Sequence, residues 1–335
     1  MSLRSQDYAA LANDAYKDHA VGRWAPDEAE VVPIGDHNYR ILEHVNNKNG
    51  YQGFIYQRVD TNEIVVAHRG TEQPLHDVVT DLGMVAARTN MQADDAIALT
   101  ARANEFAQRE ETRSGQRLDV TVTGHSLGGS LAQISAHHHG LKGETFNAYG
   151  AASLGYRIRE GGDAMVNHVM SADPVSAASG HYGEVKVYAN QTEINNLYGS
   201  GFRNGAVAGF LMPDSALLAA GRSLESHKMH NFLGAGSVLD NPASRALARQ
   251  NDGMISEYRD KLEFLRGGLT TATRGGLGNA EDIINRIRGP LEPGEPARRS
   301  ADEEARKHDG AMRMDHPGHP GNLLFQDALR GVEAQ

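Results

Sequence analysis

The stretch Val120-Thr-Val-Thr-Gly-His-Ser-Leu-Gly-Gly-Ser130 decides the fold of this chain. Its opening valines, with Leu118 just before them, are apolar and β-prone, so they predict a short buried strand. The strand ends at Gly124-His-Ser-Leu-Gly128, a complete G-x-S-x-G motif. Leucine, isoleucine and alanine residues then recur at helical spacing as far as His139, and Gly140 provides a C-terminal stop. The stretch therefore predicts a strand, a tight turn and a helix, with a serine on the turn.

The turn has the residue types that a reactive serine needs. It projects the Ser126 hydroxyl out of the sheet, and Gly124 and Gly128 leave room where a β-carbon would clash. The helix N-terminus directs N–H groups at developing negative charge, which makes the Leu127 amide a natural oxyanion donor. This pattern is typical of the nucleophile elbow of α/β-hydrolases. The alternatives are a plain Gly-rich turn and a hydrolase scaffold whose site is dead.

Composition limits the class of protein. The 335 residues are 39% apolar and 23% charged, as in an ordinary globular chain with enough material for a large core. There is no stretch of about 18 apolar residues to predict a transmembrane helix, and the first residues lack the pattern of a secretory signal. The formal net charge of −10 argues against nucleic acid as a partner and against electrostatic docking on anionic membrane. Without cysteine there is no disulfide and no Cys nucleophile, and the cysteine count does not indicate the redox compartment.

The elements around the motif predict an α/β fold. Three strand-like runs at 39–45, 51–59 and 63–68 are separated by turn residues, which predicts antiparallel N-terminal strands. Beyond the serine, helical and strand-like patterns alternate, which predicts a mostly parallel central sheet with helices on both faces. The other predicted elements are helices at 5–17, 91–112 and 241–264 and strands at 144–149, 165–171 and 184–188. We therefore expect the α/β-hydrolase fold.

Composition along the chain predicts three regions. Residues 1–265 are predicted to form one catalytic domain. Residues 266–314 are charged and punctuated by Gly and Pro, which predicts a linker containing short helices. Residues 315–335 are predicted to form a C-terminal tail.

The candidate partners of Ser126 lie downstream of it. An activated serine needs a general base, and the base needs an orienting carboxylate. In α/β-hydrolases these follow the serine in the order acid and then histidine. Asp173, after the predicted strand 165–171, is the best acid, although an Asp-Pro pair can also simply begin a turn. The base is His227 or His230, which lie three residues apart and would point to similar sides of a helical turn.

A second oxyanion donor is expected ahead of the serine. Gly70-Thr71 stands at the end of the predicted strand 63–68, where the Thr71 amide and hydroxyl would face an oxyanion together with the Leu127 amide. A Gly-Thr turn is otherwise ordinary.

Together these motifs resemble the class 3 lipase family. The residues that carry the resemblance are Ala67-His-Arg-Gly-Thr71, the elbow Gly124-His-Ser-Leu-Gly-Gly129 and Asp173-Pro-Val175. The resemblance implies an α/β-hydrolase fold with a Ser–Asp–His triad. It also implies a lid within 72–94 and ester hydrolysis on acylglycerols or phospholipids.

The resemblance also assigns roles by position. The functional positions of the family are matched by Ser126 as nucleophile, Asp173 as orienting acid, and Thr71 with Leu127 as oxyanion hole. The base of the family often precedes a short segment ending in Asn and an aromatic residue. His227-Lys-Met-His-Asn-Phe232 fits that pattern, so His227 ranks above His230 as the base. His68 stands where the family often has an apolar residue, and the role of its side chain is open.

The stretch Asp315-His-Pro-Gly-His-Pro-Gly-Asn-Leu-Leu-Phe-Gln326 is similar to the opening of the signal domain on antibacterial type IV secretion effectors. Those domains are longer, so the chain would carry a shortened version, and a polar tail with a small helix is the alternative. The resemblance implies a phospholipase A1 toxin with a cognate immunity protein as partner. We expect it to be cytoplasmic in the producer, without an N-terminal signal peptide, and then secreted to act at the target-cell envelope.

We therefore expect a serine lipid ester hydrolase that acts on phospholipid at a membrane surface, without cofactor or metal. His137-His-His139 does not predict a metal site, because consecutive residues of a helix point in different directions. One alternative is a neutral acylglycerol lipase or esterase with the same three residues. The other is a catalytically silent hydrolase fold used for partner binding.

Overall fold

The structure is a computed structural model that describes residues 3–71, 78–204, 215–267 and 289–295. By its internal contacts the chain divides into two units, residues 1–297 and 298–335. The second unit, which includes the predicted tail 315–335, lies wholly outside the described residues.

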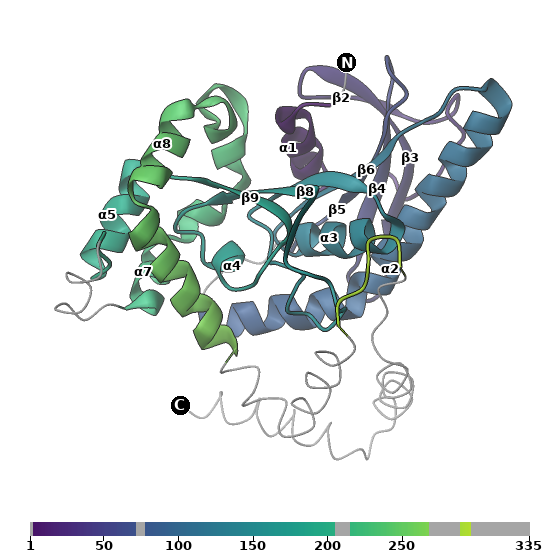
Figure 1. The fold of residues 1–335 in the computed structure, drawn as a ribbon. Helices are drawn as coiled ribbons and strands as arrows, with labels where there is room; N and C mark the ends of the chain where they lie inside the picture. The colour runs from purple at the N-terminus through teal and green to yellow at the C-terminus, as the bar shows by residue number, and fades with distance from the viewer. Residues whose placement is uncertain (1–2, 72–77, 205–214, 268–288, 296–335) are drawn as a thin grey trace, which may run out of the picture. The chain divides into compact units, whose positions relative to one another are not determined.

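A nine-stranded mixed sheet forms the centre of the described part of the first unit (Figure 1). Its strands lie in the order β1-β3-β4-β5-β6-β7-β8-β9, and β2 pairs with β3 beside this path. The pairs from β1 to β5 are antiparallel and the pairs from β5 to β9 are parallel, which confirms the predicted class. The strands are β1 (Gly22–Arg23), β2 (Val31–Ile34), β3 (His37–Asn46), β4 (Gln52–Arg58), β5 (Ile64–His68), β6 (Val120–His125), β7 (Lys142–Phe146), β8 (Gly161–Met170) and β9 (Tyr182–Tyr188).

Helices lie on both faces of the sheet, as predicted: α2 and α3 cover one face, and α1 packs on the other against β6 and β7 (Figure 1). The α-helices are α1 (Ser5–Asp14), α2 (Val78–Ser114), α3 (Leu127–His139), α4 (Pro174–Ala177), α5 (Gln191–Gly199), α7 (Ala216–Arg222) and α8 (Pro242–Gln250), and residues 252–267 are also helical. The 3₁₀ turns are η1 (Leu224–His227), η2 (Met229–Phe232), η3 (Gly234–Gly236) and η4 (Val238–Asp240). Within the described ranges, no helix combines the length and apolar content needed to span a bilayer.

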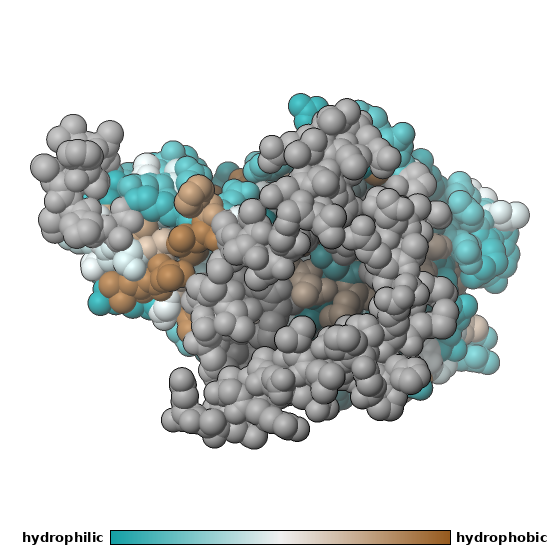
Figure 2. All heavy atoms as spheres, turned by 90° about the horizontal axis from the view of Figure 1, so that it is seen from below, coloured by the Kyte–Doolittle hydropathy of each residue, from teal (hydrophilic) through white to brown (hydrophobic). Residues whose placement is uncertain are grey.

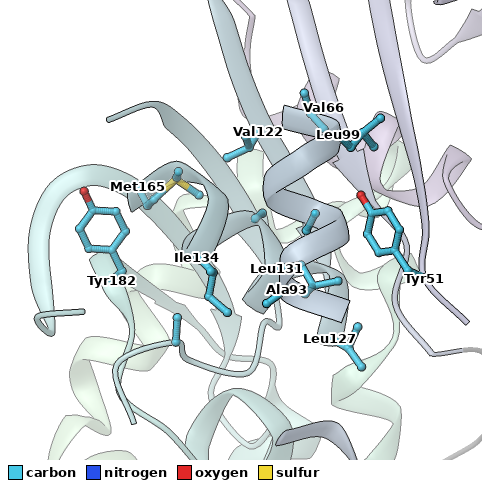
Figure 3. Packing of buried hydrophobic residues seen from close by; sticks show 14 of the residues in the cluster. Tyr51, Val66, Ala93, Leu99, Val122, Leu127, Leu131, Ile134, Met165 and Tyr182 are labelled. Atoms are coloured by element: carbon cyan, nitrogen blue, oxygen red, sulfur yellow. The ribbon is translucent and has the colours of Figure 1, made fainter. Parts of the chain in front are cut away.

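Strand β5 shows how the sheet separates two apolar cores. Successive side chains of a strand point to opposite faces. Ile64 and Val66 therefore join the core under α2 and α3, which includes Leu131 of α3 (Figure 3). Val65 and Ala67 join the core under α1. Strand β5 is buried on both faces, and its parallel pair with β6 lies in the middle of the strand order of the sheet.

Helix α2 is the largest departure from the sequence prediction, which began this helix well after its observed start at Val78. Polar residues hid the helical period. Thr89 is buried, and its hydroxyl donates a hydrogen bond of 2.8 Å to the Val85 carbonyl one turn earlier. The lid predicted within 72–94 is therefore helical from residue 78 onward, and residues 72–77 lie outside the described ones.

Two short strands and a helix break were also missed. Strands β1 and β2 both pair with β3, and they are too short for an alternating pattern to show in the sequence. The helix predicted over 241–264 is interrupted at Asn251, which follows α8. Its side-chain amide donates a hydrogen bond of 2.9 Å to the Leu247 carbonyl and so satisfies one acceptor at the end of α8.

Part of the predicted linker, residues 289–295, belongs to the first unit and packs within it. The Gly294 amide donates to the His137 carbonyl at 2.7 Å, and the Leu291 amide donates to the Arg157 carbonyl at 2.9 Å. His137 Nε2 also lies 3.2 Å from the Leu291 carbonyl. Residues 289–295 therefore pack beside the last turn of α3.

Candidate active site

The turn between β6 and α3 holds Ser126 in a strained backbone conformation. Ser126 has φ 58° and ψ −127°, a region that residues with a side chain rarely adopt. A β-carbon on Gly124 would overlap the Gly128 backbone, and one on Gly128 would overlap the His68 carbonyl, so the turn can close this tightly only with glycine. The Ser126 amide donates to the Phe146 carbonyl at 3.2 Å, which attaches the elbow to the end of β7.

Ser126, His227 and Asp173 are joined by two hydrogen bonds. Ser126 Oγ lies 2.9 Å from His227 Nε2, and His227 Nδ1 lies 2.8 Å from Asp173 Oδ1. Ser126 and Asp173 are buried, whereas the His227 side chain is 12% exposed. A carboxylate in this position accepts the Nδ1 proton and leaves Nε2 able to accept a proton from the serine. The structure thus brings together three of the residues that the sequence singled out.

Asp173 is held in place by the start of α4. Its Oδ1 accepts from the Val175 amide at 3.2 Å, and its Oδ2 accepts from the Ser176 amide at 3.0 Å, as in an N-cap. Burial alone would raise the pKa of Asp173. The charge of His227 and the hydrogen bonds from His227 and Ser176 outweigh burial, so the pKa of the carboxyl lies below its usual value. The ionised carboxylate can therefore orient His227.

His227 and His230 do not share a face, so the helical spacing expected from the sequence was wrong. His227 ends η1 and His230 belongs to η2. Lys228 between them is extended, with φ −74° and ψ 144°, and the chain changes direction there. His230 is exposed, and the structure gives it no hydrogen bond to Ser126 or Asp173. The geometry favours His227 as the partner of the serine.

Thr71 and Leu127 approach the elbow from two elements. Leu127 is the first residue of α3, where amides have no acceptor within the helix. Thr71 follows β5, which runs parallel to β6 with His68 opposite Gly124. Because these strands end at the same edge of the sheet, the residues after β5 lie beside the elbow. This placement suits two oxyanion donors.

His125, inside the motif, has contacts that sequence reasoning did not anticipate. Its Nε2 lies 2.7 Å from the His227 carbonyl, which can only accept, so this nitrogen carries the proton. Its Nδ1 then accepts from the Tyr16 hydroxyl at 2.8 Å. Burial lowers the pKa of His125 to about 3, so the ring is neutral. His125 therefore supports the main chain of His227 without adding charge to the site.

Glu193, in the first turn of α5, is another buried group that the sequence did not place in the site. Its Oε1 accepts from the Ala172 amide at 3.1 Å, and it also forms a hydrogen bond with the Ser226 side chain. Burial raises the pKa of Glu193 to about 7, against the opposing effect of these donors. Glu193 thus contacts the residues that directly precede Asp173 and His227. Such contacts have no local sequence signal, because the partners are distant along the chain.

Other histidines noted in the sequence have partners away from the site. His68 is fully buried, with Nδ1 2.9 Å from the Tyr51 hydroxyl and Nε2 3.2 Å from the Ser135 hydroxyl. His139 Nε2 lies 3.0 Å from the Ile97 carbonyl. In the part of the chain that the structure describes, no group of three or more His, Asp or Glu side chains is placed to hold a metal ion.

Comparison with known families gives one match. Residues 7–177 match the model of a phospholipase-like family described as the Tle-like phospholipase domain. The matched residues include Ser126 and Asp173 and end before His227. No curated protein matches the sequence. The family match supports a lipase or phospholipase hydrolase.

Several solved lipase structures are similar to part of the chain. The Lip2 lipase from Yarrowia lipolytica is 13% identical over 55% of this chain and 77% of its own, with a TM-score of 0.36. A triacylglycerol lipase from Penicillium expansum is 15% identical over 71% of this chain and 95% of its own, also with a TM-score of 0.36. The lipase of Rhizomucor miehei in a propeptide complex is 15% identical over 55% of this chain and 67% of its own, with a TM-score of 0.35.

Proposed function

We propose that this chain, which belongs to the family of Tle-like phospholipase domains, is a serine hydrolase that cleaves acyl esters of phospholipids. The observation that carries the proposal is the line of hydrogen bonds from Ser126 through His227 to Asp173, which starts at a strained elbow. In this proposal Ser126 is the nucleophile, His227 the general base and Asp173 the orienting acid. The amides of Thr71 and Leu127 form the oxyanion hole.

Acylation begins when Ser126 Oγ attacks the ester carbonyl while His227 Nε2 takes the serine proton. The carbonyl oxygen becomes an oxyanion and accepts hydrogen bonds from the Thr71 and Leu127 amides. The intermediate then collapses and the ester C–O bond breaks. His227 gives its proton to the departing lysophospholipid oxygen, and the acyl group stays on Ser126.

Water completes the reaction. His227 takes a proton from a water molecule, whose oxygen attacks the acyl carbonyl, and the fatty acid leaves as Ser126 regains its proton. Asp173 stays ionised and stabilises the imidazolium that forms in each half-reaction. Its lowered pKa supports this role, because the carboxylate does not compete for the proton.

Exposed apolar side chains support contact with lipid. Leu217 and Leu218 on α7 are each 45% exposed, and Phe264 is 80% exposed. Figure 2 shows apolar residues gathered in one area of the lower face, on the side where Figure 1 places α7. Because the chain carries a formal net charge of −10, burial of apolar side chains, rather than attraction to anionic headgroups, would hold it at a membrane surface.

The first test measures fatty acid release from vesicles of defined phospholipids. Ser126→Ala should lower kcat by about a million-fold, because it removes the nucleophile. Ser135→Ala is the matched control, since it also removes a serine beside a histidine, and it should keep the activity. Retained hydrolysis by Ser126→Ala would exclude Ser126 as the nucleophile.

The product profile tests the finer assignment. We propose A1 specificity, on the basis of the effector resemblance of the C-terminal stretch. Phospholipids with different acyl chains at the two positions should release the sn-1 chain, as followed by mass spectrometry. Release of the sn-2 chain would contradict A1 specificity, and faster hydrolysis of triglycerides would favour a neutral lipase.

The proposed setting is antibacterial, and its support is the resemblance of residues 315–326, which lie outside the described residues. In this proposal the protein is made in the cytoplasm of the producer and secreted, and it acts at the target-cell envelope. A cognate immunity protein would protect the producer. Expression directed to the periplasm of a test bacterium should be toxic, and the Ser126→Ala variant should be harmless. Equal toxicity of the variant would separate any toxic effect from ester hydrolysis.

A further inference from the structure

Asn147, directly after β7, combines complete burial with an unusual backbone. Its φ is +43°, a left-handed value that few residues other than glycine adopt. Among the described non-glycine residues with positive φ, the two that are buried are Ser126 and Asn147. Strained residues persist where the surrounding structure determines them, and they gather at functional sites. The backbone of Asn147 therefore calls for a specific cause.

The Asn147 side chain connects two segments of the site. Its Oδ1 accepts from the Met170 amide at 2.9 Å, and its Nδ2 donates to the Ser226 carbonyl at 2.7 Å. Met170 ends β8, shortly before Asp173, and Ser226 directly precedes His227. One side-chain amide thus spans the segments that carry the acid and the base.

The backbone of Asn147 explains how its side chain reaches both segments. The Asn147 amide donates to the His168 carbonyl at 2.8 Å, which continues the pairing of β7 with β8. The positive φ then turns the main chain away, and the side chain supplies the acceptor for Met170. Phe146, its neighbour, accepts from the Ser126 amide. The same turn therefore contacts the segments of all three residues.

A turn alone does not account for this asparagine. Asn62, between β4 and β5, also has a positive φ of 60°, and asparagine commonly tolerates such a value in turns. Asn62 is only partly buried, and the structure describes no hydrogen bond of its side chain to another element. Glycine would meet the backbone requirement at either position. At Asn147, by contrast, both polar side-chain atoms are used, each on a different element.

We propose that Asn147 is a positioning residue that sets Asp173 and His227 relative to each other. This inference rests on the proposed serine hydrolase. His227 must keep one ring nitrogen at Ser126 and the other at Asp173, so a small shift of either segment lengthens one of the two bonds. Glu193 links the same two segments through Ala172 and the Ser226 side chain, and Asn147 supplies a second link from the end of β7.

The test compares Asn147→Gly and Asn147→Asp in the full chain, with Asn62→Gly as the matched control. Glycine at 147 permits the positive φ but removes the link, whereas aspartate keeps the shape and turns an oxygen toward the Ser226 carbonyl. The readout is the rate at which a fluorophosphonate labels Ser126. Labelling needs the aligned serine and histidine but no phospholipid, and thermal unfolding measures whether each variant is folded.

We expect Asn147→Gly to be labelled roughly ten- to hundredfold more slowly than the wild type, because a small misplacement of reacting groups costs this much. Asn62→Gly should be labelled at the wild-type rate. Asn147→Asp should be slow while its carboxylate is ionised and should recover, relative to the wild type, as the pH falls. A protonated carboxyl can again donate to Ser226, and burial near Asp173 and Glu193 raises the pKa of the introduced acid.

Wild-type labelling of a folded Asn147→Gly variant would overturn the proposal. So would an Asn147→Asp variant whose rate relative to the wild type stays as low at acidic pH as at alkaline pH. If one variant does not fold, the other decides, and if neither folds, Asn147 holds the fold rather than the alignment and the proposal is wrong. A wild type that is not labelled would overturn the serine hydrolase, and this role with it. A labelled wild type that does not cleave phospholipid would overturn the substrate class alone.

Discussion

Helix α3 carries two serines that face histidines. Ser126, at its N-cap, lies 2.9 Å from His227 Nε2, and Ser135, further along the helix, lies 3.2 Å from His68 Nε2. Each histidine has a third partner on its Nδ1, and each pair joins elements that are distant in sequence. The two serine–histidine distances are similar. The pairs must therefore differ in the direction of the hydrogen bond and in the burial of the histidine.

In the core pair, Ser135 with His68, the hydrogen bond runs from the histidine to the serine. The Ser135 hydroxyl donates to the Ala132 carbonyl at 3.2 Å, so it accepts from the N–H of His68 Nε2. His68 Nδ1 accepts from the Tyr51 hydroxyl at 2.9 Å. Burial lowers the pKa of His68 to about 3. This histidine therefore has no lone pair left to take a proton from a serine.

In the pair at the elbow, Ser126 with His227, the hydrogen bond has the opposite direction, from the serine to the histidine. Asp173 accepts the Nδ1 proton of His227, which leaves Nε2 as an acceptor for Ser126. The His227 side chain is 12% exposed, whereas His68 is fully buried. A short serine–histidine distance therefore identifies only a candidate. The third partner of the histidine decides which pair can act as nucleophile and base.

The largest expected effect comes from replacing the group that bonds Nδ1 of each histidine, Asp173 for His227 and Tyr51 for His68. Asp173→Asn should lower kcat by about 10⁴-fold, because an amide favours the wrong tautomer of the histidine. Tyr51→Phe removes the third partner of His68, and it should leave kcat unchanged while costing about 1 kcal/mol of stability. Ester hydrolysis and urea unfolding measure the two effects. A similar loss of kcat in both variants would mean that the two pairs are coupled rather than distinct.

A smaller effect is expected at Gly128, which follows Ser126 by two residues and packs on the main chain of His68. A β-carbon on Gly128 would overlap the His68 carbonyl, so Gly128→Ala should push the start of α3 away from β5. We expect a stability loss of about 3 kcal/mol, the upper end for overpacking, together with loss of the elbow geometry. Gly221→Ala in α7 is the control, because nothing lies within 4 Å of the added carbon. The control should be stabilised by up to about 1 kcal/mol, as measured by urea unfolding.

If Gly128→Ala kept both stability and activity, the close packing of α3 on β5 would not be what holds the elbow. Loss of activity with full stability would instead confine the effect to the elbow and leave the core pair intact. The two measurements on one variant thus separate the two pairs.

The elbow and the acid were predictable because their requirements are local. Gly124 and Gly128 flank the serine within one motif, and Asp173 follows a strand within an Asp-Pro pair. The choice between His227 and His230 was only partly predictable. It rested on a resemblance, and the assumed helical spacing was wrong because Lys228 is extended.

The supporting residues could not be predicted, because their partners are far away in sequence. Asn147 bonds to residues 23 and 79 positions further along the chain, and His125 bonds to the main chain 102 positions away. No periodicity or motif records such contacts. The fold was predictable in class, since β-strand and helix patterns alternate, but the true start of α2 was not, because polar residues such as Thr89, whose hydroxyl bonds back to its own helix, interrupt the apolar period.

The smallest expected effect is a change with pH in the stability that His68 provides. Its pKa is lowered from 6.5 to about 3 by burial, so the unfolded chain binds a proton at this residue where the folded chain does not. The stability that depends on neutral His68 is therefore complete above pH 6.5, and it is lost progressively as the pH falls toward 3. His68→Gln removes this dependence and keeps one donor and one acceptor, but it replaces the ring with a smaller side chain of different shape.

We therefore expect wild type and His68→Gln to differ most in free energy of unfolding near neutral pH. The difference should shrink by roughly 2 kcal/mol at about pH 5, at 1.36 kcal/mol for each pH unit below the unfolded pKa. Urea unfolding at the two pH values measures it, and His125 and His181, which burial also keeps neutral, cancel because both proteins contain them. A difference that does not change with pH would mean that His68 takes up a proton in the folded protein. The histidine of the core pair could then accept a proton, and proton acceptance would no longer distinguish it from His227.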